Sequence, residues 1–148
     1  MTQMKHIISA ARLRTLPLSL SCIITGNAIA YYFESFSWVI FGLSIWTTVM
    51  LQVISNFSND LGDSEKGTDN EHRIGPQRAI QSGAIQVDEM KKIIKFSIGI
   101  ALVSGILLIL VSNLIWWEKL IIFMMGLLSI WAANNYTRGN VAYGYRAY

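Results

Sequence analysis

Charged residues gather in one stretch, Ser55 to Gly83, of a chain that is otherwise apolar. Carboxylates come first in this stretch and arginines follow: Asp60, Asp63, Glu65, Asp69 and Glu71, then Arg73 and Arg78. Carboxylate oxygens suit Mg²⁺, which completes its octahedron with water and phosphate oxygens, and arginine binds phosphate through two parallel hydrogen bonds. The order of charges therefore predicts a site for a metal ion and a diphosphate. The alternative for the basic residues is a topogenic signal that holds the segment on one side of a membrane.

A polar stripe leads into the acidic stretch from an apolar segment. Gln52, Asn56, Asn59 and Asp63 recur at steps of four, three and four, which places them on one side of a helix. Polar groups at membrane depth are costly and usually face a bundle interior or an aqueous cavity. The stripe therefore fits either the wall of a site or a seam of hydrogen bonds between helices.

The acidic stretch places negative charge at the wrong end of a helix. Asp60 and Asp63 lie near the predicted C-terminal end, where the helix dipole disfavours carboxylates by a few tenths of a kcal/mol or more. A divalent cation would relieve this repulsion. The spacing of the carboxylates does not match a calcium-binding EF-hand, and the chain has no P-loop and no zinc-type set of Cys and His.

The elements that must position these residues are membrane helices. The chain has 148 residues, of which 53% are hydrophobic and only 14% are charged, with a mean hydropathy of +0.42. A soluble four-helix bundle is the alternative, but its helices would need a polar face that these segments lack. Four apolar segments are each long enough to cross a bilayer of about 30 Å. We predict an all-α membrane bundle with a site loop over 59–92 and spans near 16–33, 36–58, 94–114 and 119–136.

Basic residues predict the orientation of the bundle. Eleven of the twelve Lys and Arg residues fall on one side of the four spans, and only Lys119 falls on the other. By the positive-inside rule, the N-terminus, the site loop and the C-terminus are expected to be cytoplasmic, in a multi-pass protein of the plasma membrane. The single Cys22 implies no disulfide framework. We expect no nucleic-acid partner.

Three motifs carry a resemblance to a known family. The segment "NDLGDSEKGTD", Asn59 to Asp69, resembles the first aspartate-rich motif of the UbiA superfamily of intramembrane prenyltransferases. The segments "ARLRTLP" and "RIGPQRAIQSG" are similar, more narrowly, to the branch that prenylates 1,4-dihydroxy-2-naphthoate in menaquinone synthesis. The general motif has an Asp where Gly67 stands here, and that branch shares the departure.

The resemblance implies a reaction and a role for each site residue. A polyprenyl group would pass from polyprenyl diphosphate to 1,4-dihydroxy-2-naphthoate, with decarboxylation, giving demethylmenaquinone. Asp60, Asp63 and Asp69 would hold Mg²⁺ on the diphosphate, and Arg73 and Arg78 would stabilise the departing charge. The polar stripe Gln52, Asn56 and Asn59 would bind and orient the metal-bound group.

The resemblance covers only the N-terminal half of the family's pattern. Family members have about nine membrane helices and a second aspartate-rich motif, which is absent from this sequence. We therefore expect this polypeptide to be inactive without a C-terminal half or a complementary chain. The alternatives are a four-helix membrane assembly subunit, a small transporter in which Gln52, Asn56 and Asn59 line a polar path, and a prenyltransferase for another aromatic acceptor.

Overall fold

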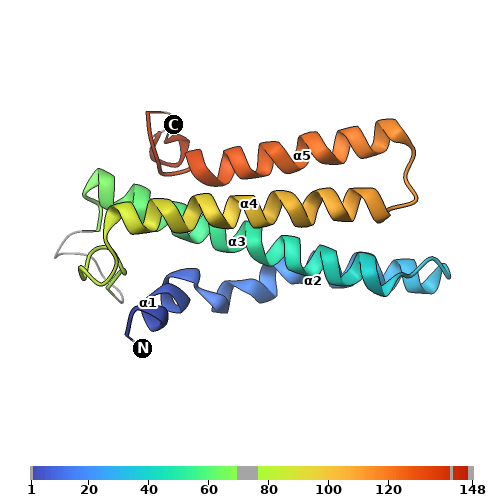
Figure 1. Ribbon diagram of the computed structural model, residues 1–148, viewed down its shortest axis with the longest axis horizontal. Coiled ribbons are helices and arrows are strands. Elements are labelled where there is room, and N and C mark those ends of the chain that lie inside the picture. Colours follow the sequence, from blue (N-terminus) through green and yellow to red (C-terminus); the bar gives the residue numbers. More distant parts are fainter. Residues whose placement is uncertain (1, 70–76, 141, 147–148) are drawn as a thin grey trace.

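The computed structural model describes residues 2–69, 77–140 and 142–146 of the chain (Figure 1), with side chains from Met4 onward. Every regular element in these residues is helical, which confirms the predicted all-α class. The elements are α1 (Thr2–Ala11), η1 (Leu13–Thr15), α2 (Leu16–Tyr32), α3 (Trp38–Lys66), α4 (Val87–Val111), α5 (Trp116–Asn135) and η2 (Tyr143–Tyr145).

Four helical segments are long and apolar enough to cross a membrane: Met4–Tyr32, Trp38–Lys66, Val87–Val111 and Trp116–Asn135. Many of their large apolar side chains are exposed, and none of the residues of α2 and α5 is buried. Exposed apolar surface on this scale is unfavourable in water but matches the hydrocarbon of a bilayer. The prediction of several membrane-spanning helices is therefore confirmed by the length and composition of the helices.

The helix α3 is longer than the second predicted span. It continues past residue 58 to Lys66, so Asn59, Asp60 and Asp63 are helical rather than part of a loop. It ends where Gly67 adopts a left-handed conformation with φ of 71°, which a glycine takes without steric cost. The connection to α4 is therefore 67–86, shorter than the predicted loop over 59–92, because α4 already begins at Val87.

The helix α3 is the central element, since it contacts α1, α2, α4 and α5. Both chain ends and the connection between α3 and α4 lie at one end of the bundle, and the two short turns lie at the other (Figure 1). At that other end, Trp38 and Trp116 are more than three-quarters exposed at the starts of α3 and α5, as expected for anchors at a membrane interface.

The larger of two buried apolar clusters lies at the end that carries the charges. Its buried residues come from α1, α3, α4 and the α3–α4 connection: Ala10, Ala11, Phe57, Leu61, Ala79, Ile85, Met90 and Ile94. The part of the connection around Ala79 and Ile85 is therefore packed against the helices rather than solvated. The charged residues that surround this core are therefore carried by segments that pack against one another.

Gly62 on α3 allows the segment that follows α5 to approach closely. A Cβ atom at this position would lie 2.4 Å from Thr137 Oγ1 and 2.7 Å from the Thr137 carbonyl oxygen. Replacing Gly62 with Ala is expected to lower the free energy of unfolding by about 1–3 kcal/mol, the usual cost of overpacking. Denaturant unfolding in detergent micelles measures this, and Gly42→Ala is the control because its Cβ would meet no atom within 4 Å. Equal effects of the two substitutions would contradict the prediction.

Candidate functional site

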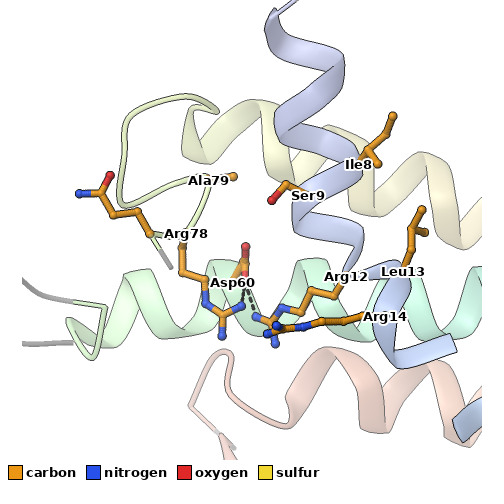
Figure 2. Close-up of a pocket in the computed structure, with 9 residues that line it drawn as sticks. Ile8, Ser9, Arg12, Leu13, Arg14, Asp60, Arg78 and Ala79 are labelled. Atoms are coloured by element: carbon orange, nitrogen blue, oxygen red, sulfur yellow. Dashed lines mark hydrogen bonds and ion pairs between the residues drawn. The ribbon is translucent and has the colours of Figure 1, made fainter. Parts of the chain in front are cut away.

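Asp60 is a buried carboxylate that two arginines share. Its side chain is 1% exposed, and Oδ1 accepts a hydrogen bond from the Arg12 guanidinium. The Nη1 atom of Arg78 lies 3.3 Å from the same oxygen. Figure 2 shows the two guanidinium groups converging on Asp60 from different elements. A buried carboxylate needs such partners, because desolvation without them would cost several kcal/mol.

Arg12 is placed by the break between α1 and η1. Its backbone is left-handed, with φ of 50° and ψ of 54°, a conformation that is rare and costly for residues other than Gly. The preceding Ala11 is buried against α3, and its carbonyl oxygen accepts a hydrogen bond of 2.8 Å from Asn56 Nδ2. The packing of α1 on α3 thus fixes the turn that aims Arg12 at Asp60.

Arg78 is placed by the connection between α3 and α4. The next residue, Ala79, is buried in the core, and its carbonyl oxygen accepts a 3.1 Å hydrogen bond from the Ile85 amide. The Nε atom of Arg78 also lies 3.9 Å from Asp69 Oδ2. Arg78 therefore lies between two predicted metal ligands, Asp60 and Asp69.

A cavity of about 320 Å³ opens beside this cluster. Its charged lining consists of Asp60 and three arginines, Arg12, Arg14 and Arg78 (Figure 2). Ser9 and Gln77 add polar groups to the wall. A guanidinium carries five N–H donors, so the arginines have more donors than one carboxylate can accept. The excess of positive charge suits an anion that offers several oxygens, as a phosphate group does.

Asp63 lies one turn further along α3 and has a different environment. It is half-buried, and its Oδ1 accepts a 2.5 Å hydrogen bond from the Tyr145 hydroxyl. Burial raises the pKa of Tyr145, and the hydrogen bond to Asp63 raises it further. The hydroxyl therefore keeps its proton at neutral pH and remains a donor.

The polar stripe is used for contacts between helices. Gln52 Nε2 and Asn56 Nδ2 each lie 3.3 Å from Thr15 Oγ1, and Asn59 Oδ1 accepts a 3.2 Å hydrogen bond from Thr137. These bonds join α3 to η1 and to the segment that follows α5, as the seam interpretation expected. The ligand-binding roles of Gln52, Asn56 and Asn59 stay predictions.

The model of the UbiA prenyltransferase family matches residues 19–147, most of the chain. The chain belongs to the UbiA prenyltransferase family. It is 42% identical over 137 residues to a 1,4-dihydroxy-2-naphthoate octaprenyltransferase of Haemophilus influenzae, a match of 91% of this chain and 44% of the relative. A relative with the same name from Escherichia coli is 38% identical, in a match of 93% of this chain and 45% of the relative. Another from Mycobacterium leprae is 30% identical, in a match of 95% of this chain and 46% of the relative. No solved structure shows a significant match.

The UbiA chain described here thus spans about half the length of the curated relatives that it matches. The match confirms the resemblance drawn from the aspartate-rich and arginine motifs. It also confirms that the resemblance lies in the N-terminal half of those relatives.

The carboxylate oxygens of this UbiA chain are ligands of the type that magnesium prefers, although they do not form a complete coordination shell. Within the described ranges, no three His, Cys, Asp or Glu residues lie close enough to hold a metal ion together. One or two carboxylates suffice for Mg²⁺ when a diphosphate supplies further oxygens. Asp60 fits this role less well than predicted, since its Oδ1 is bound by two guanidinium groups. Asp63, whose Oδ1 accepts a hydrogen bond from the Tyr145 hydroxyl, fits it better, whereas Asp69 also lies near the Arg78 guanidinium. Arg73, which was predicted to stabilise the departing charge, lies outside the residues that the structure describes, as does Glu71.

Two residues of the site were not predicted from the sequence. Arg12 was counted among the basic residues of the positive-inside pattern and lies in the motif "ARLRTLP", but it was given no role in the site, and neither was Tyr145. Their partners Asp60 and Asp63 lie 48 and 82 residues away in the chain. For Arg12, the available signal was its place in the family-like motif "ARLRTLP".

Proposed function

We propose that this chain supplies the N-terminal part of an enzyme that transfers a polyprenyl group from its diphosphate to 1,4-dihydroxy-2-naphthoate. The carboxyl group of the acceptor leaves as CO2, diphosphate is released from the donor, and the prenylated product is demethylmenaquinol, the quinol form of demethylmenaquinone. The observation that carries the proposal is the arginine-rich cavity at one end of the four apolar helices, in a chain of the UbiA family. Three relatives named for this acceptor support the choice of substrate.

The membrane setting suits both ends of the donor substrate. A polyprenyl chain is apolar and fits the hydrocarbon, whereas its diphosphate needs a charged site near water. The arginine-rich cavity is lined by residues of α1 and by Asp60 near the C-terminal end of α3. Figure 1 shows α1 at the end of the bundle where both termini lie. The distribution of basic residues supports a cytoplasmic location for that end. The plasma membrane is the proposed location of the protein.

In the proposed reaction, the arginines bind the diphosphate and stabilise the charge that builds up as it leaves. Arg78 is held between Asp60 and Asp69, and Arg12 is held by Asp60, so both guanidinium groups are positioned before the substrate arrives. Preorganised donors of this kind stabilise developing negative charge without reorganising during the reaction. Arg73 is proposed to share this role.

Magnesium, when bound, would supply charge that polarises the diphosphate oxygens and helps the group to leave. Asp63 and Asp69 are the residues proposed to hold it, and Asp60 is proposed to act mainly through Arg12 and Arg78. Asn59, which hydrogen-bonds Thr137, is proposed to orient the neighbouring carboxylates.

The experiment that tests the proposal measures activity with and without a C-terminal partner. The purified chain in lipid vesicles is expected to form no product from octaprenyl diphosphate and 1,4-dihydroxy-2-naphthoate. Co-expression with the C-terminal half of the Haemophilus influenzae relative is expected to yield prenylated naphthoquinol, detected by mass spectrometry. Prenylation of 4-hydroxybenzoate instead would contradict the proposed acceptor, and turnover by the chain alone would contradict the need for a partner.

A further inference from the structure

The hydroxyl of Tyr145 bridges the acidic end of α3 and the segment that follows α5. It donates a 2.5 Å hydrogen bond to Asp63 Oδ1 and lies 2.7 Å from Thr68 Oγ1. Asp63 lies 82 positions before Tyr145 in the chain. Neither the fold nor the proposed roles above account for this contact.

The segment that carries Tyr145 is fixed to α5 by its own contacts. The Gly144 amide donates a 2.7 Å hydrogen bond to the Tyr136 carbonyl oxygen, and a Cβ atom at Gly144 would lie 2.8 Å from that oxygen. The Tyr143 hydroxyl donates a 3.0 Å hydrogen bond to the Ala132 carbonyl oxygen, and its ring stacks on Trp131 at 6.2 Å. The Tyr145 hydroxyl therefore belongs to a turn that hydrogen bonds and ring contacts hold against α5.

A carboxylate that binds a metal ion depends on the groups that orient it. Free rotation about the Cβ–Cγ bond spreads the two oxygens over many positions, and a hydrogen bond to one oxygen restricts them. Loss of such a supporting partner typically lowers metal affinity by about 10–100-fold. Asp63 is half-buried and Tyr145 is 40% exposed, so an effect near the lower end of this range is expected.

We propose that Tyr145 is a positioning residue that holds the Asp63 carboxylate for a magnesium–diphosphate ligand. The inference rests on the proposed function, in which Asp63 binds the metal ion. It gives the turn after α5 a role in the site and ties that role to one hydroxyl group.

The test measures binding of inorganic diphosphate to the purified 148-residue chain by isothermal titration calorimetry in detergent micelles. Each variant is titrated once in excess magnesium and once in EDTA, so that metal-dependent and metal-free binding are separated. Tyr145→Phe is expected to raise Kd in magnesium about tenfold and to leave Kd in EDTA unchanged. Asp63→Asn is expected to remove the difference between the two conditions.

Tyr143→Phe is the matched control, because it removes a hydroxyl from the same turn without touching Asp63. It is expected to leave both Kd values unchanged. If Tyr145→Phe behaves like Tyr143→Phe while Asp63→Asn loses the magnesium effect, the positioning role is wrong and the proposed metal site stands. If Tyr145→Phe raises both Kd values equally, its role is merely structural. If magnesium does not strengthen binding even in the unaltered chain, the proposed metal site fails and the inference fails with it.

Discussion

Replacing Asp63 with Ala is expected to lower kcat/KM about a thousandfold in the enzyme completed by a C-terminal half. The proposed metal ion stabilises the departing diphosphate by several kcal/mol, and each 1.36 kcal/mol is tenfold in rate. Asp63 is the half-buried carboxylate that carries no arginine contact among those described, so its second oxygen suits a metal ion better than Asp60 does. Steady-state prenylation assays at saturating magnesium measure the effect.

Glu65→Ala is the control for this experiment. Glu65 lies two residues further along α3, is exposed, and pairs with Lys91 at 3.8 Å. Its removal deletes the same charge from the same helix end and is expected to change kcat/KM less than about threefold, because exposed ion pairs contribute little. A rate for Asp63→Ala within threefold of the unaltered enzyme would remove Asp63 from the site.

Replacing Asp60 with Asn is expected to lower the free energy of unfolding by about 3–5 kcal/mol, the usual effect of removing one partner from a buried ion pair. The substitution leaves Arg12 and Arg78 beside each other without the carboxylate that they share. Both arginine side chains are only 18% exposed, so water replaces that carboxylate poorly. Denaturant unfolding of the chain in detergent micelles, followed by circular dichroism, measures the change.

A double-mutant cycle separates the ion pair from the general effect of the substitution. Asp60→Asn combined with Arg12→Gln is expected to cost less than the sum of the two single changes by about 1–3 kcal/mol, since either change alone already breaks the pair. Asp63→Asn is the control, because it disturbs only a partly exposed hydrogen bond and is expected to cost about 1 kcal/mol. Equal losses for Asp60→Asn and Asp63→Asn would contradict the division of roles between the two aspartates.

The polar stripe shows how far a helical pattern predicts a site. The spacing of Gln52, Asn56 and Asn59 places them on one side of α3, which the structure confirms in so far as all three contact other elements. Spacing alone did not separate a ligand wall from a hydrogen-bond seam. Those hydrogen bonds account for the polarity of the stripe without requiring the transport path considered above.

By itself, the sequence determined the four apolar helices, the family and the acidic and basic motifs. Each of these depends on composition or on residues that are close together in the chain. The length of an apolar segment and the helical period of its residues can be read from such local patterns. Only the tertiary structure decided that Asp60 binds Arg12 and that Asp63 binds Tyr145. These pairs form because α1 packs against α3 and because the turn after α5 is braced beside the end of α3. Two aspartates three residues apart on one helix thus acquire different partners, since each faces a different neighbouring element.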